Sequence, residues 1–209
     1  MRADARRNQE LLLTAARDVF VERGPEAPLE EIARRAGVGI ATLYRRFADR
    51  ETLMYEVVHS ALVATAQAAE QVKRENPEPL DALAAYVHAV LELRTSVVIP
   101  TLLGELDLDE PRIKAARRKS ARLANQLVSA AHDSGALRKD VTFGDVGMML
   151  VRLSRPLPGA IPPEMQSEIA HRHADLFLAG LRAEPSSDLL SGPALELDDL
   201  QELRPRRKR

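Results

Sequence analysis

The feature that most constrains this fold is the short break between two helical patterns in residues 28–47, PLEEIARRAGVGIATLYRRF. The first pattern opens with a proline, has acids in its first turn and ends at Gly37, and these are signals of a helix start and stop. The second begins after Gly39, so three residues connect the two helices. Apolar residues over 5–23 follow the spacing of a longer helix in front of them. A longer helix followed by two short ones with a glycine-containing turn predicts a helix-turn-helix unit.

Helical signals continue through the rest of the chain. Alanine, leucine, arginine and glutamate dominate, whereas β-branched and aromatic residues are few, so intrinsic propensity favours helix over strand. The sequence predicts an all-α fold of about nine helices, with a helix-turn-helix domain over 1–50, a helical domain over 51–183 and a tail over 184–209. Further helices are expected from an N-cap at Asp49 to about Asn76, from Leu80 to a break at Pro100, over 101–106, over 110–134, from a cap at Thr142, and from Glu164 to about Arg182.

Composition excludes several classes of protein. Thirty basic and thirty-one acidic residues leave a net charge of -1, so bulk charge predicts neither attraction to nucleic acid nor repulsion from it. The chain has no cysteine, which removes disulfides and thiolate metal sites. We find no signal-peptide pattern and no apolar run of the roughly 18 residues that a membrane span needs. A cytoplasmic protein without membrane segments is expected.

The third helix, from about Ile40 to Phe47, has a buried side and an outward side. At about 100° per residue, Leu43 and Phe47 define the buried side, while Ile40 lies close to it and could pack or project. The outward ridge is formed by Ala41, Thr42 and Arg45, and its flanks by Tyr44 and Arg46.

Such a ridge fits the major groove of DNA. An arginine such as Arg45 can bind guanine with two hydrogen bonds, and the methyl group of Thr42 can contact thymine. Tyr44 and Arg46 would then face the two phosphate walls, and phosphate contacts fix the register of a protein on the duplex. Arg50 and the free N–H groups near the start of the fourth helix would add a phosphate anchor.

The stretch EEIARRAGVGIATLYRRFADRETLMYEVV resembles the N-terminal domain of the tetracycline-repressor (TetR/AcrR) family, and the match is dense over about residues 7–58. The resemblance implies a homodimeric repressor that binds a palindromic operator and leaves it when a small molecule enters the C-terminal domain. Two departures are Gly39, where a serine commonly caps the recognition helix, and Ala27-Pro28, where serine or threonine commonly caps the second helix. The predicted DNA-binding residues are Gly39, Ala41, Thr42, Tyr44, Arg45, Arg46 and Arg50.

By the same resemblance, the last two helices pair with their copies in a dimer. Their apolar faces are wide enough for a core side and a partner side. Dimers of helix-turn-helix proteins read two half-sites, which explains how one short helix per subunit gives adequate affinity. The predicted interface consists of Val146, Met149, Leu150, Leu153, Ile169, His173, Leu176, Phe177 and Gly180.

The effector pocket is expected among the fourth to eighth helices. Four candidate ligand contacts have ordinary alternatives: each histidine can be a surface or satisfied core residue, and the arginine can form an ion pair with Glu92 or Glu105. No metal site is predicted, because His171 and His173 point about 200° apart on a helix, and no cofactor motif is found. The candidates are His59, Tyr86, His88 and Arg94.

These features together predict a ligand-responsive, homodimeric transcriptional repressor whose partners are double-stranded DNA and an unidentified small molecule. One alternative is a protein-interaction module that keeps the helix-turn-helix shape, since a fold alone does not give a function. Another is a small helical enzyme, which would need convergent acid-base or metal groups that the sequence lacks. The basic end RPRRKR could add DNA affinity or serve as a solubilising tail.

Overall fold

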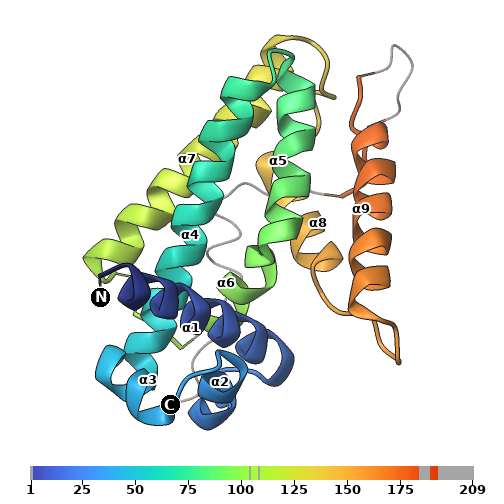
Figure 1. The fold of residues 1–209 in the computed structure, drawn as a ribbon. Helices are drawn as coiled ribbons and strands as arrows, with labels where there is room; N and C mark the ends of the chain where they lie inside the picture. Colours follow the sequence, from blue (N-terminus) through green and yellow to red (C-terminus); the bar gives the residue numbers. More distant parts are fainter. Residues whose placement is uncertain (1, 104, 108, 184–188, 193–209) are drawn as a thin grey trace. The chain divides into compact units, whose positions relative to one another are not determined.

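The computed structural model describes residues 2–103, 105–107, 109–183 and 189–192, and within these ranges the regular structure is helical (Figure 1). The predicted all-α class with about nine helices is confirmed. The helices are α1 (Arg2–Arg23), α2 (Leu29–Arg35), α3 (Ile40–Arg46), α4 (Arg50–Glu75), α5 (Pro79–Leu93), α6 (Thr95–Leu103), α7 (Pro111–Asp133), α8 (Phe143–Leu153) and α9 (Pro163–Gly180).

Two helix starts follow the predicted caps. The Asp49 carboxylate accepts a hydrogen bond of 2.7 Å from the backbone N–H of Thr52, which holds the pKa of Asp49 below its usual value. At α8, the backbone N–H of Thr142 donates to the carboxylate of Asp145 at 2.8 Å, as in a capping box. Both contacts provide an acceptor for a backbone N–H group that would otherwise have no hydrogen-bond partner at the start of a helix.

The predicted break at Pro100 is wrong. α5 ends instead at Leu93, and the next residue, Arg94, adopts the left-handed conformation (φ 52°) and donates its N–H to the carbonyl of Leu91 at 3.0 Å. Pro100 lies inside α6 rather than before it. A proline this close to the end of a helix removes one backbone hydrogen bond and leaves only three residues after it to be disturbed, so helix breaking is weak there.

The chain divides into two compact units by packing. The first contains residues up to 63 together with 97–116, and the second contains 64–96 together with the residues from 117 onward. α4, α6 and α7 each contribute to both units. The functional division predicted at residues 50 and 183 therefore follows different boundaries from the packing and stays a prediction. The predicted tail lies outside the described residues except for 189–192.

The first unit has a continuous apolar core. α1 packs on α2, and α2 packs on α3. Phe20, Ile32 and Leu43 are completely buried within it, as are Leu53 and Val57 at the start of α4. Each of these helices thus buries one apolar face, which fixes α3 against the rest of the unit.

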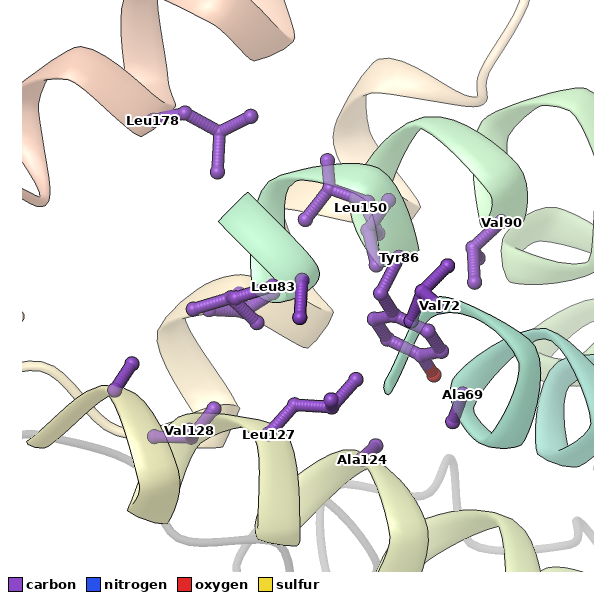
Figure 2. Packing of buried hydrophobic residues seen from close by; sticks show 14 of the residues in the cluster. Ala69, Val72, Leu83, Tyr86, Val90, Ala124, Leu127, Val128, Leu150 and Leu178 are labelled. Carbon is purple, nitrogen blue, oxygen red and sulfur yellow. The ribbon is translucent and has the colours of Figure 1, made fainter. Parts of the chain in front are cut away.

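The second unit has its own core, in which α5 packs against α8 and α9. Figure 2 shows the ring of Tyr86 surrounded by apolar side chains that include Ala69, Val72 and Leu127. This burial raises the pKa of the Tyr86 hydroxyl above its ordinary value. Tyr86 is therefore a neutral core residue.

Over the described ranges, no single helix is long and apolar enough to cross a membrane. α5 and the start of α6 reach that length and apolar character only when taken together, across a bend of 64°. Most residues of α5 on its apolar face belong to the core of the second unit.

Candidate nucleic-acid interface

The turn between α2 and α3 is built on Gly37. Its backbone has φ +70°, a conformation that costs other residues about 1–2 kcal/mol. Its N–H donates to the carbonyl of Arg34 at 3.1 Å, and the N–H of Val38 donates to the carbonyl of Ala33 at 3.0 Å. These two bonds form a Schellman motif, which ends α2 and sets the direction in which the chain enters α3.

The start of α3 has no side-chain cap. Gly39 occupies the N-cap position with an extended backbone (φ −71°, ψ 147°), and its carbonyl accepts hydrogen bonds from the N–H groups of Thr42 and Leu43. A Cβ atom at Gly39 would meet nothing within 4 Å. The position is thus open to a larger residue and shaped for a serine or threonine cap.

The inward face of α3 agrees with the angular prediction. Leu43 is fully buried and Phe47, directly after the helix, is 2% exposed. Ile40, which the sequence left open, packs partly against the same core. Three apolar side chains therefore anchor a helix of seven residues.

The outward face of α3 is polar and aromatic. Tyr44, one of three tyrosines in the chain, is 49% exposed, which is high for a large aromatic side chain. Nη2 of Arg45 donates to Oγ1 of Thr42 at 3.4 Å, so these two side chains lie together on the ridge. Ala41 and Arg46 are exposed beside them. The helix thus has an apolar inner face and an outer face rich in hydrogen-bond donors.

Ion pairs add to the bracing of α2 against α1. Arg35 donates to both carboxylate oxygens of Glu22 at 2.7 and 2.8 Å, and this raises the pKa of Arg35. Arg34 donates to Glu31 within α2, which lowers the pKa of that carboxyl. The Glu22–Arg35 pair joins two helices with bidentate geometry, so it orients them more than a single surface contact would.

Arg50 contacts the backbone of its own chain. Its Nη1 donates to the backbone carbonyls of Pro25 and Ala27 at 2.8 and 2.6 Å, so the side chain ties the start of α4 to the connection between α1 and α2. The nearby N–H of Thr52 is already capped by Asp49, whose negative charge opposes a phosphate there. The geometry therefore gives Arg50 a structural role through Nη1, and its phosphate contact stays a prediction.

The predicted dimer residues fall into two groups. Val146 and Leu150 are 0% and 4% exposed within a single chain, so they have no side-chain surface left for a partner. Both belong to the core of the second unit because α8 turns its most apolar stripe toward α5. The rest are partly or fully exposed and stay a predicted interface: Met149, Leu153, Ile169, His173, Leu176, Phe177 and Gly180.

The four candidate ligand residues do not form one cluster. Tyr86 is buried in the core, Arg94 is exposed at the end of α5, and His59 is electrostatically close to Glu110 in the first unit. His88 contacts His171 and Asp175 of α9. Their role as ligand contacts stays a prediction. Over the residues whose placement is described, no group of three or more histidines and acids is arranged to hold a metal ion.

A hollow of about 210 Å³ lies between α8 and the end of α9. Met148, Met149 and Phe177 line it, with Asp145 and Arg152 as its charged groups. The volume is below the roughly 300 Å³ at which drug-sized ligand sites begin. Sequence reasoning missed Met148 and Arg152, although their spacing of four residues places them on the same face of a helix.

Two family models match the chain. The model described as "Bacterial regulatory proteins, tetR family" matches residues 12–57, which include the turn and α3. The model described as "Transcriptional regulator SbtR-like, C-terminal domain" matches residues 78–183. The chain belongs to the TetR family of bacterial transcriptional regulators.

Individual TetR-family proteins agree with this assignment. The HTH-type transcriptional repressor BepR of Brucella suis is 30% identical over 165 residues, which cover 73% of this chain and 79% of BepR. The TetR regulator SCO0520 of Streptomyces coelicolor is 28% identical with a TM-score of 0.59, covering 83% of this chain and 97% of that one. A TetR regulatory protein of Mycobacterium vanbaalenii is 27% identical with a TM-score of 0.60, covering 87% and 99%. The family and these relatives are regulators of transcription and not enzymes.

Gly39→Ser should stabilise the fold, because the serine hydroxyl can accept a hydrogen bond from the N–H of Thr42, which glycine cannot do. The expected gain is a few tenths of a kcal/mol in the free energy of unfolding, measured by urea denaturation. Gly39→Ala is the matched control, because it adds a Cβ without an acceptor and should lower stability by about 0.5–1 kcal/mol. Equal stability of the two variants would contradict the assignment of Gly39 as the N-cap.

Proposed function

We propose that this TetR-family regulator is a homodimer that represses transcription from a palindromic operator and is released from it by a small molecule. The observation that best supports DNA reading is the outer face of α3. Tyr44 is half exposed and the Thr42–Arg45 pair lies beside it, on a helix whose inner face is anchored by Leu43 and Phe47. An exposed aromatic and donor-rich face on a rigidly held helix is suited to recognition of a partner surface.

In the proposed complex, α3 enters the major groove with its ridge toward the bases. Arg45 donates two hydrogen bonds to a guanine once it leaves Thr42, whose methyl group is then free to contact a thymine. Tyr44 and Arg46 donate to phosphates on the two sides of the groove. Arg50 keeps α4 tied to the connection before α2 and so fixes the orientation of the unit that holds α3.

Dimerisation would use the exposed residues of α8 and α9. Leu176 is 63% exposed and Met165 is 51% exposed, an unfavourable arrangement for apolar side chains in water. A two-fold pairing of these helices would cover both residues and give each dimer two copies of α3. Two recognition helices match a palindrome whose half-sites are about one duplex turn, or a multiple of it, apart.

The effector would act on the second unit. LfrR of Mycobacterium smegmatis, a structural neighbour at 19% identity, is described in complex with proflavine, and KstR2 of Mycobacterium tuberculosis is described as a ketosteroid transcriptional regulator. These names support a small organic effector as a class. Because α4 and α7 belong to both units, a ligand that alters their packing in the second unit also acts on helices of the first.

Substitutions on α3 test the docking. With an operator selected from random duplexes, Arg45→Ala should weaken binding by about 1–3 kcal/mol, or roughly five- to 150-fold in Kd, and relax the preference at one base pair of each half-site. Tyr44→Phe should weaken binding up to about tenfold through the loss of one phosphate hydrogen bond, with no change in sequence preference.

Arg122→Ala is the control for these variants, because Arg122 is an exposed arginine of α7 outside the first unit. It should bind the operator as the wild type does. Unchanged Kd and unchanged base preference for both α3 variants would show that α3 is not the reading helix.

Leu176→Glu tests the dimer. A charge at this position would be buried in an apolar interface, so the variant should sediment as a monomer at concentrations where the wild type is a dimer. Its circular dichroism should match that of the wild type, because Leu176 lies outside the core of its own chain. Leu11→Glu is the control, since Leu11 is 45% exposed on α1 and lies outside the proposed interface. A Leu176→Glu dimer as tight as the wild-type dimer would contradict this interface.

Release by an effector has a thermodynamic signature. A compound that weakens operator binding by a given factor must itself bind the operator complex more weakly than the free protein by the same factor. We expect a factor of at least about five for an effective inducer. Calorimetry with the free protein and with the operator complex measures it for each compound that binds. Equal or tighter binding to the complex by every such compound would contradict release.

A further inference from the structure

α5 and α9 meet through a chain of four ionisable side chains. Nδ1 of His88 lies 2.7 Å from Nδ1 of His171. Nε2 of His88 lies 3.0 Å from Oδ1 of Asp175, and Nε2 of His171 lies 2.6 Å from Oε1 of Glu92. Each histidine therefore contacts the other histidine on one side and a carboxylate of the opposite helix on the other side.

The two imidazoles face each other through their edges. Their planes are within 11° of parallel, and their centroids are 5.0 Å apart. This separation equals the Nδ1–Nδ1 distance plus roughly one ring radius at each end, so both nitrogens lie between the rings, near the line that joins the centroids. That arrangement fits an N–H···N hydrogen bond. The two Nδ1 atoms are directed at each other and not toward a common third point, which is where a bound metal ion would have to lie.

The three contacts are compatible with one another at only one number of protons. An ionised carboxylate only accepts, so Nε2 of both His88 and His171 must carry a proton. The two Nδ1 atoms can share only one proton between them. All three contacts are therefore hydrogen bonds together only when the four ring nitrogens hold three protons, with one imidazole neutral, the other an imidazolium, and the carboxylates of Glu92 and Asp175 on either side.

Adding or removing one proton would break one of the three hydrogen bonds, which are His88–His171, His88–Asp175 and His171–Glu92. With one more, two N–H groups would face each other at 2.7 Å. With one fewer, either two lone pairs would face each other or one Nε2 would present a lone pair to a carboxylate. Both side chains are about one-quarter to one-third exposed, so protons can exchange with solvent.

The other charged groups near the pair belong to α5, α8 and α9. α8 packs against both helices, but its Asp145 is hydrogen bonded to Thr142 and its Arg152 lines the hollow beside Phe177. The remaining ionisable side chains of α5 and α9 other than the core residue Tyr86 are exposed, namely Asp81, Glu164, Glu168, Arg172 and His173, as is Arg94 after α5.

We propose that His88 and His171 form a proton switch that joins α5 to α9 fully only while the two imidazoles share one proton. Imidazole is the side chain whose ordinary pKa, about 6.5, lies in the physiological range. The packing of α9 against α5 is therefore most stable at intermediate pH and becomes less stable at lower and at higher pH.

The switch also bears on dimerisation, and this part rests on the proposed function. Asp175 directly precedes Leu176, the most exposed apolar residue of the proposed interface. A change at the His88–Asp175 contact acts on the same turn of α9 that would meet the partner. The dimer should then be tightest in the pH range where the pair shares its proton.

Nitrogen-15 NMR of the full chain with labelled histidines, from pH 5 to 9, tests the switch. Two of the five histidines should titrate in a coupled manner and show one strongly downfield Nδ1 proton at intermediate pH. This signal should vanish in His88→Gln and in His171→Gln. It should persist in the control His132→Gln, because the ring of His132 in α7 lies 3.0 Å from the carbonyl oxygen of Arg138 and takes no part in the cluster. Independent titration of all five histidines without the downfield proton would overturn the proposal.

Thermal unfolding provides a second measurement. The difference in Tm between wild type and His171→Gln should be largest at intermediate pH and shrink toward pH 5 and pH 9, and a difference that does not vary with pH would overturn the proposal. Sedimentation at the same pH values separates the proton switch from its proposed link to the dimer interface. A dimer whose dissociation constant is independent of pH, beside a confirmed NMR signal, would reject only the link to the interface. A monomer at every pH would reject the proposed dimer and leave the proton switch to the NMR result.

Discussion

The pair of backbone hydrogen bonds that closes the turn at Gly37 determines how α3 is held. In one, the N–H of Gly37 donates to the carbonyl of Arg34; in the other, the N–H of Val38 donates to the carbonyl of Ala33, and both require the left-handed backbone of Gly37. α3 has only seven residues, which is too short to be stable alone. Its position therefore depends on this turn, on the burial of Leu43 and on the bracing of α2 by α1. The outer face of α3 is therefore held in position by contacts of the turn, of the inner face of α3 and of α2.

Local signals in the sequence were sufficient for most of the helices and for the two faces of α3. Proline and glycine punctuation, the Asp49 cap and an apolar period of 3.6 residues act within a few residues of each other, so they can be read without a structure. Arg50 shows the limit of that reasoning. Its basic side chain suits a phosphate equally well, and only the fold reveals that the carbonyls of Pro25 and Ala27 lie within its reach.

The second unit was harder to predict because its helices bury more than one face. Val146 and Leu150 have the spacing of an interface stripe, but the same spacing serves a core, and burial decides between the two. The His88–His171 pair spans 83 residues of sequence and could not be found from either helix alone. The sequence does contain a weak signal of this pair, because each histidine is followed four residues later by an acid, Glu92 or Asp175. The two motifs come into contact when α5 and α9 pack together.

The central claim is that Arg45 of α3 reads bases in the major groove from each half of a two-fold complex. Methylation protection at guanine N7 on a selected operator tests it most directly, because N7 is exposed only in that groove. We expect protected guanines in two half-sites related by a dyad, and the loss of one symmetric pair of protections in Arg45→Ala. Protections that are absent from the half-sites, or that persist unchanged in Arg45→Ala when the variant is bound at saturation, would contradict it.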